Sequence, residues 1–131
     1  MGFPTATTQT SQAVGNTTTP TATFPAASAG DLIIAIMAQD GAGTFTWPGA
    51  GATWQEIADH AFTGGTTHIA YLIAASGETS VTPTSTLSER SNHIVLSIPA
   101  ATWHGTTPPE VTIVSTATTL RNHCHAWLDR A

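Results

Sequence analysis

The chain has 131 residues, enough for one domain that buries its own hydrophobic core. Only 8% of the residues are charged, the formal net charge is −5, and the only cationic residues are Arg90, Arg121 and Arg130. Nucleic acids and anionic membrane surfaces both require clustered lysine or arginine, so we expect neither of them as a partner.

Threonine dominates the polar part of the composition, with 26 residues. It is β-branched and favours extended structure. Because 40% of the residues are hydrophobic and four are tryptophan, the low charge does not indicate disorder. The composition therefore predicts an all-β protein with a neutral, hydroxyl-rich surface, of the kind found on secreted proteins, adhesins and virus particles.

The N-terminal part is rich in Thr, Ala, Ser and Pro. Pro4, Pro20 and Pro25 prevent a continuous helix. We interpret residues 1–29 as an extended arm, in which residues 17–25 are suited to an edge strand because proline is tolerated at sheet edges. Two alternatives remain for this arm: an unstructured terminus, or a segment that becomes ordered against a neighbouring subunit.

The most apolar stretch is "GDLIIAIMAQDG", from Gly30 to Gly41. Its seven consecutive apolar residues, 32–38, are too few for a confident helix and include three isoleucines. We therefore predict a buried central strand at 31–38. The following "QDGAG" (39–43) predicts a turn, since Asp-Gly is a strong hairpin signal.

Six further strands are expected along the chain, at 44–47, 54–57, 66–74, 80–87, 91–99 and 111–116. The strands at 66–74 and 91–99 alternate clearly between two faces. The large apolar residues expected on one face of each are Ile69, Tyr71 and Ile73 in the first strand, and Ile94, Leu96 and Ile98 in the second. The stretch 80–87 contains Pro83 and is polar, which favours an edge strand.

About eight strands separated by Gly/Pro turns, without a convincing helix, are typical of an antiparallel β-sandwich or barrel. Our first choice is a jelly-roll-like sandwich and our second a Greek-key immunoglobulin-like sandwich. The predicted organisation is an arm at 1–29, a sandwich domain at 30–116 and a C-terminal tail at 117–131. The tail differs in composition from the rest and is interpreted as a capping helix or a tail of separate origin.

A metal site is the first kind of chemistry to consider. His123, Cys124 and His125 are possible ligands, but on a strand Cys124 would point away from the two histidines. A structural zinc site needs four ligands, commonly from two clusters, and no second cluster is present. The other histidines are scattered at His60, His68, His93 and His104, so we expect no metal.

Catalytic motifs are also missing from the sequence. There is no G-x-S-x-G element, and nothing pairs Glu56 with Asp59, or Glu78 with Glu89, as a glycosidase would require. Isolated carboxylates such as Asp40 fall short of a calcium cage. We therefore predict no enzyme activity, no catalytic residue and no cofactor.

Carbohydrate binding is the main alternative, because β-sandwich modules bind sugars with exposed tryptophan faces. Trp47 and Trp54 flank a turn, and Trp103 lies in a predicted loop. Weakly charged surroundings suit neutral glycans.

Cys124 is the only cysteine, which excludes an intrachain disulfide and is consistent with synthesis in a reducing compartment. The N-terminal "MGFPTATTQT" has neither a basic region nor an apolar run, so we expect no secretory signal there.

Several blocks of the chain, in this order, resemble small structural proteins of tailed bacteriophages, including capsid decoration (cement) proteins and related virion β-sandwiches. The resemblance covers roughly residues 1–115. The blocks that carry it are "MGFPT" (1–5), "AGDLIIAIMAQDG" (29–41), "TFTWPGAGATW" (44–54), "HIAYLIAASGE" (68–78) and "HIVLSIPA" (93–100).

The resemblance implies a non-enzymatic protein on the capsid exterior of a virion, made in the bacterial host cytoplasm, that stabilises the shell by bridging capsomers. Its implied partners are the major capsid protein and further copies of itself, with a trimer favoured. The alternative is a glycan- or receptor-binding module of a tail fibre or adhesin. The residues expected to make contacts are Phe3, Pro4, Pro20, Phe24 and Trp103.

Overall fold

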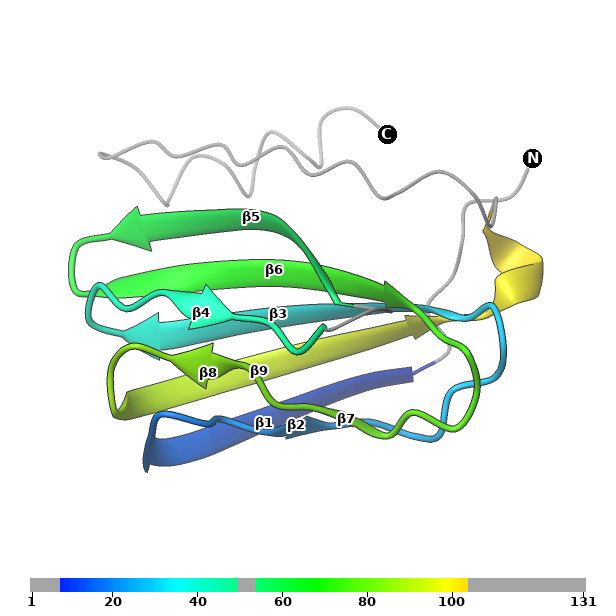
Figure 1. The fold of residues 1–131 in the computed structure, drawn as a ribbon, viewed down its shortest axis with the longest axis horizontal. Helices are drawn as coiled ribbons and strands as arrows, with labels where there is room; N and C mark the ends of the chain where they lie inside the picture. The colour runs from blue at the N-terminus through cyan, green and yellow to red at the C-terminus, as the bar shows by residue number, and fades with distance from the viewer. Residues whose placement is uncertain (1–7, 50–53, 104–131) are drawn as a thin grey trace, which may run out of the picture.

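The computed structural model describes residues 8–49 and 54–103. These residues form nine β-strands and one short 3-10 turn, η1 (Ala100–Thr102) (Figure 1). The predicted all-β class is therefore confirmed. The strand expected at 111–116 and the tail at 117–131 lie outside the described residues.

Five long strands form one antiparallel sheet in the order β1-β9-β3-β6-β5. Their bounds are β1 Thr8–Thr17, β3 Leu32–Asp40, β5 Gln55–Phe62, β6 Gly65–Ile73 and β9 Glu89–Ile98. The apolar stretch predicted as a central strand is β3, which pairs with β6 on one side and with β9 on the other. That prediction is confirmed.

A second, thinner layer covers one face of this sheet (Figure 1). It contains two short ladders: β2 (Ala22–Thr23) pairs with β7 (Ser80–Val81), and β4 (Phe45–Thr46) pairs with β8 (Thr84–Ser85). Pro83 separates β7 from β8, because proline cannot donate to a ladder. The single strand expected at 80–87 is consequently two short strands.

The core lies between the two layers. Alternate residues of β3 face it, namely Ile33, Ala35 and Met37, and each is fully buried. Phe24 and Val81 face them from the second layer. Burying a side chain of this size contributes about 1.5–3 kcal/mol, so the apolar central strand is a main source of stability.

The Asp-Gly signal after β3 does not form the hairpin that it predicts. β3 pairs with β6 and β9, and the chain passes from Gly41, at φ +76°, into the second layer. The tight hairpin in this part of the sheet joins β5 to β6 at residues 63–64, with Gly64 at φ +92°. A positive φ suits glycine because it has no Cβ.

The interpretation of residues 1–29 as an arm separate from the sandwich does not hold for the described residues 8–29. β1 pairs with β9 from Thr8↔Ser97 to Thr17↔Glu89 and is a full member of the sheet. Downstream, the Phe24 amide donates to the Thr79 carbonyl at 2.8 Å. The strand expected at 17–25 is in fact the end of β1 followed by the two-residue β2.

The described strands form an antiparallel sandwich of one five-stranded sheet and two two-stranded ladders. A jelly-roll connectivity is not confirmed. No helix in the described part of the chain is long and apolar enough to cross a membrane.

Candidate functional site

The strongest candidate for an interaction site is the outer edge of β1. β9 pairs with one side of this ten-residue strand, and no described strand pairs with the other side. Its sequence, TQTSQAVGNT, contains neither charge nor proline, and Ser11, Ala13 and Gly15 are exposed. A long edge strand without these protective features presents unpaired N–H and C=O groups to another extended chain.

Hydrogen bonds to the second layer hold β1 in place. The Thr10 hydroxyl donates to the Thr23 carbonyl at 3.1 Å. Gln12 donates to the same carbonyl at 3.3 Å, and its side-chain oxygen accepts from the Thr23 amide at 3.1 Å. Because the strand is already ordered, a partner would meet a preformed edge, which lowers the entropy cost of binding.

The opposite edge of the sheet has a different character. β5 carries Glu56, Asp59 and His60, and its pairing with β6 shifts register between Glu56 and Ala58. Charged side chains discourage strand addition. The register shift does not distinguish the two edges, because β1 also shifts register against β9, between Val14 and Thr17. The two edges of the sheet therefore differ in charge, and β1 is the neutral one.

The structure changes the set of expected contact residues. Phe3 and Pro4 lie outside the described residues. Pro20 is fully buried and Phe24 is 6% exposed in the core, so neither side chain is available to a partner, and the prediction is wrong for these two. Trp103 is half-buried, and its indole N–H donates to the Gly30 carbonyl at 3.0 Å, which ties the chain after β9 to the start of β3.

The tryptophans considered for glycan binding form part of an aromatic cluster. Trp47 and Trp54 stack with ring centroids 6.0 Å apart, and both pack against the core. Phe24 meets Trp54 edge-on, and the Trp47 indole N–H donates to the Glu56 carboxylate at 2.8 Å. Both rings are therefore partly buried in this cluster. The glycan alternative stays a prediction.

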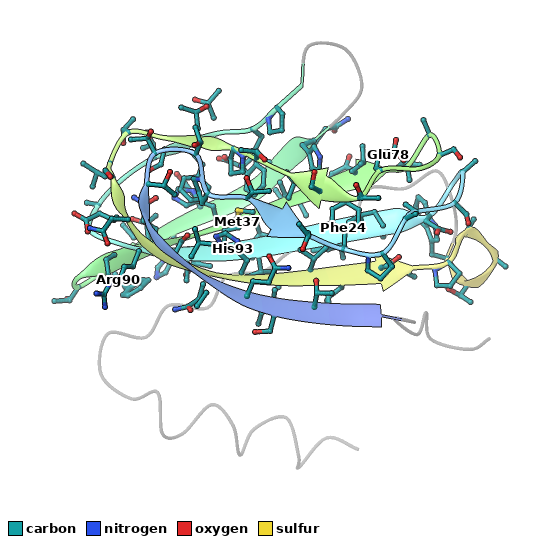
Figure 2. All side chains as sticks on the ribbon, turned by 90° about the horizontal axis from the view of Figure 1, so that it is seen from below. Phe24, Met37, Glu78, Arg90 and His93 are labelled. Carbon is teal, nitrogen blue, oxygen red and sulfur yellow. The ribbon has the colours of Figure 1, made fainter. Side chains whose placement is uncertain are left out.

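Two buried histidines flank Met37 in the core. His68 on β6 and His93 on β9 both face Met37 on β3, and both imidazoles are 1% exposed. Met37 and His93 point into the space between the layers (Figure 2). His68 stacks on Phe45 with ring centroids 4.2 Å apart. The histidines thus lie on either side of the central strand.

Burial favours the neutral form of both histidines. Burial lowers the pKa of His68, and the opposing influences of Glu56, Asp59 and the Gly43 carbonyl are smaller. Burial also lowers the pKa of His93, with the Thr21 carbonyl acting in the opposite direction.

Within the described residues, neither nitrogen of His68 has a hydrogen-bond partner with good geometry, and neither does Nδ1 of His93. An imidazole in such surroundings favours its uncharged form.

One arrangement resembles a catalytic pair. The Ser91 hydroxyl and Nε2 of His93 are 2.7 Å apart, as in a nucleophile and its base. Ser91 is 3% exposed and His93 1%, and the other nitrogen of His93 has no partner in the described part of the chain. A substrate cannot reach this pair in the folded core, so we interpret it as packing.

The ligand clusters considered from the sequence do not come together in the described residues. His104, His123, Cys124 and His125 lie outside them. Within residues 8–49 and 54–103, no three His, Cys, Asp or Glu side chains are grouped in a way that could hold a metal ion.

Sequence reasoning missed β1 as a site because its residues were read as an arm. One signal was available: residues 5–19 contain no proline and include several threonines, a composition that favours a strand. The hydrophobic alternation that marks β3, β6 and β9 is absent from β1.

Comparison with family models, with curated proteins and with solved structures finds no match for this chain.

Proposed function

We propose that this protein is a non-enzymatic structural subunit of a virion, of the capsid decoration type, that joins a neighbouring subunit through the open edge of β1. The observation that carries the proposal is the contrast between the two edges of the sheet. Both strands have a free side among the described strands, but β5 carries charged residues, whereas β1 is neutral. The partner is an extended segment of a shell protein or of another copy of the chain.

Strand addition fits the chemistry of β1. Backbone N–H and C=O groups along the edge supply the hydrogen bonds, and the small side chains of Ser11, Ala13 and Gly15 leave room for a second chain. The scarcity of charge around the site also helps, because burying an unpaired charge in an interface is costly.

Many identical binding sites on a shell would add to the affinity of a single strand edge. A shell presents the same site many times, and an oligomer that engages several sites at once gains avidity without new contacts. Avidity is the physical reason for expecting the chain to act as an oligomer; the trimer is the state that the resemblance to decoration proteins implies.

Charge placed on the edge tests the proposal. The double variant Ala13→Lys/Gly15→Lys adds two cations at exposed positions of β1, and a Cβ at Gly15 meets no atom within 4 Å. We expect its affinity for particles stripped of the protein to fall about tenfold or more, equivalent to about 1.4 kcal/mol. The readout is the amount of protein that co-sediments with the particles as a function of its concentration.

The matched control is Thr63→Lys, which adds a cation at an exposed position in the β5–β6 turn. It should bind as the unmodified protein does, and all variants should keep the same melting temperature. Unchanged binding by the β1 variant would exclude the edge as the attachment site. Absence of the protein from purified particles would exclude the virion role altogether.

A further inference from the structure

The two buried histidines lie where the five-stranded sheet meets the second layer, and each is close to a different ladder. His68 stacks on Phe45 of β4, with ring centroids 4.2 Å apart and ring planes 13° from parallel. His93 lies close to the Thr21 carbonyl, directly before β2. His68 therefore contacts the β4–β8 ladder, and His93 lies beside the segment that leads into the β2–β7 ladder.

The second layer is held together by far fewer backbone bonds than the sheet below it (Figure 1). Each of its ladders pairs two residues of one strand with two of the other. In the sheet, β3 pairs with nine residues of β6 and with eight of β9. Local opening of a protein occurs where the fewest contacts have to break. The second layer is therefore the part of the sandwich that can separate without unfolding the sheet.

The surroundings of both imidazoles suit the neutral ring. In the described residues, neither nitrogen of His68 has a hydrogen-bond partner, and neither does Nδ1 of His93. Nε2 of His93 lies 2.7 Å from the Ser91 hydroxyl. A protonated imidazole has two N–H donors, so a proton on either ring leaves at least one buried donor without an acceptor. Burying such a charge is costly.

The charged groups that act on His68 are both on β5. Asp59 stands opposite His68 in the register between β5 and β6, and Glu56 is three residues earlier on the same strand. Their carboxylates favour the protonated ring, but burial outweighs them and lowers the pKa of His68. The neighbours on β3 and β4, Met37 and Phe45, are uncharged.

His93 faces uncharged groups across the sheet. Its partners in register are Gln12 on β1 and Met37 on β3, and the second layer contributes a backbone carbonyl. On β9 itself, Glu89 and Arg90 lie four and three positions before it. Burial lowers the pKa of His93 as well. Both rings are therefore neutral near pH 7 while the layers are closed, and water stabilises their charged form once the layers part.

We propose that the second layer is an acid-sensitive flap: when His68 and His93 take up protons, its two ladders separate from the five-stranded sheet, which stays folded. Histidine protonation drives such changes because the charged ring is solvated in the open form only. Opening uncovers the face of β3 around Met37 and releases Thr23 from its bonds to Thr10 and Gln12. This behaviour belongs to the isolated chain, whatever partner the β1 edge binds.

Amide hydrogen exchange of the unmodified protein between pH 7.5 and pH 5.5 tests the opening. The measured quantity is the protection factor, the exchange rate of the unfolded chain divided by that of the folded protein at the same pH. For each histidine that becomes exposed, the opened fraction should rise by up to about tenfold over this range. Peptides of the two ladders should lose protection accordingly, whereas peptides of β3, β6 and β9 should keep theirs.

Two variants assign the response to the histidines. His68→Phe keeps a flat ring against Phe45 but cannot take up a proton, so the β4–β8 peptides should lose less protection at pH 5.5. His93→Gln should do the same for the β2–β7 peptides. Thr63→Gln, in the exposed β5–β6 turn, removes no titrating group and is the control that should behave as the unmodified protein does.

Three results overturn the proposal. The first is a second layer whose protection factors stay the same between pH 7.5 and pH 5.5. The second is an equal loss of protection in β3, β6 and β9, because the whole domain then unfolds and no flap opens. Both are measured on the unmodified protein, so they hold even where a variant does not fold. The third is an unchanged response in the double variant His68→Phe/His93→Gln, which assigns the opening to other groups.

Discussion

At the scale of single residues, Asp31 explains why a carboxylate precedes the central strand. Its two oxygens accept from the Ser28 amide at 2.9 Å and from the Ala100 amide at 3.0 Å. The side chain therefore ties the turn before β3 to the turn after β9. The sequence showed an Asp after a glycine, but not its partner, because Ala100 lies 69 positions away.

Replacing Asp31 by alanine should remove both bonds and lower the free energy of unfolding by about 1–3 kcal/mol, the usual cost for backbone donors that lose a charged acceptor. Urea denaturation followed by circular dichroism measures this value. Asp31→Asn keeps one acceptor oxygen and should cost less than alanine. An alanine variant as stable as the unmodified protein would show that the two bonds are replaced by water without loss.

The buried histidines predict how stability depends on pH. Their pKa values are lowered by burial in the folded state, so below about pH 6.5 the unfolded chain binds more protons than the folded chain. Stability should therefore be highest above this value and should fall as the pH drops towards the folded-state pKa values. The effect amounts to about 1.4 kcal/mol for each unit by which a pKa is lowered.

Thermal melting between pH 7.5 and pH 5 measures this effect. His68→Gln and His93→Gln remove one titrating group each and should flatten the curve, even if each variant is less stable overall. Thr63→Gln in the exposed β5–β6 turn removes no titrating group and serves as the control, so it should leave the slope unchanged. An unmodified protein whose melting temperature stays constant over this range contradicts the account.

At the scale of elements, the sequence predicted the strands that carry large apolar residues on at least one face. β3 was recognised from its run of apolar residues, which includes three isoleucines. β6 and β9 were recognised because large apolar residues occupy every second position in the second half of each strand. β1 was missed because neither of its faces carries a row of large apolar residues: Thr10 and Gln12 form hydrogen bonds to Thr23, and the positions between and beyond them are small or polar. A strand stabilised by polar contacts leaves little hydrophobic period to detect.

Long-range pairing explains why the predicted turn after β3 does not form a hairpin. The Asp-Gly dipeptide after β3 indicated a hairpin, but the neighbours of β3 are β6 and β9, which are distant in sequence. Local turn chemistry identified the bend at Gly41 correctly. It carries no information about which strand comes to lie beside β3.

Two deletions test the role of β1 as part of the sheet. Removal of residues 2–7 is the control, because it leaves the described strand Thr8–Thr17 intact. Removal of residues 2–17 should lower the melting temperature strongly and cause aggregation, because it exposes the edge of β9 and removes the bonds from Gln12 to Thr23. Thermal scans and size-exclusion chromatography measure both effects. If the longer deletion is as stable as the full chain, β1 is a dispensable arm.

At the scale of the whole molecule, the sequence predicted the class of fold better than the site. Composition and turn spacing were enough for an all-β sandwich, because both reflect local preferences. Pro20 and Phe24 were expected to meet a partner, but they face the core, since the segment that contains them crosses the second layer. Which edge of a sheet remains open depends on strand order, and strand order is set by contacts between distant residues.

The central claim is that the open edge of β1 is where this protein attaches to its neighbour. Amide hydrogen exchange, measured by mass spectrometry on the free protein and on the protein bound to particles, tests it most directly. We predict that binding slows exchange in peptides covering Thr8–Thr17, because their outward amides gain partners, and that it leaves peptides of the β5 edge unchanged. Slower exchange at β5 with no change at β1 would contradict the account.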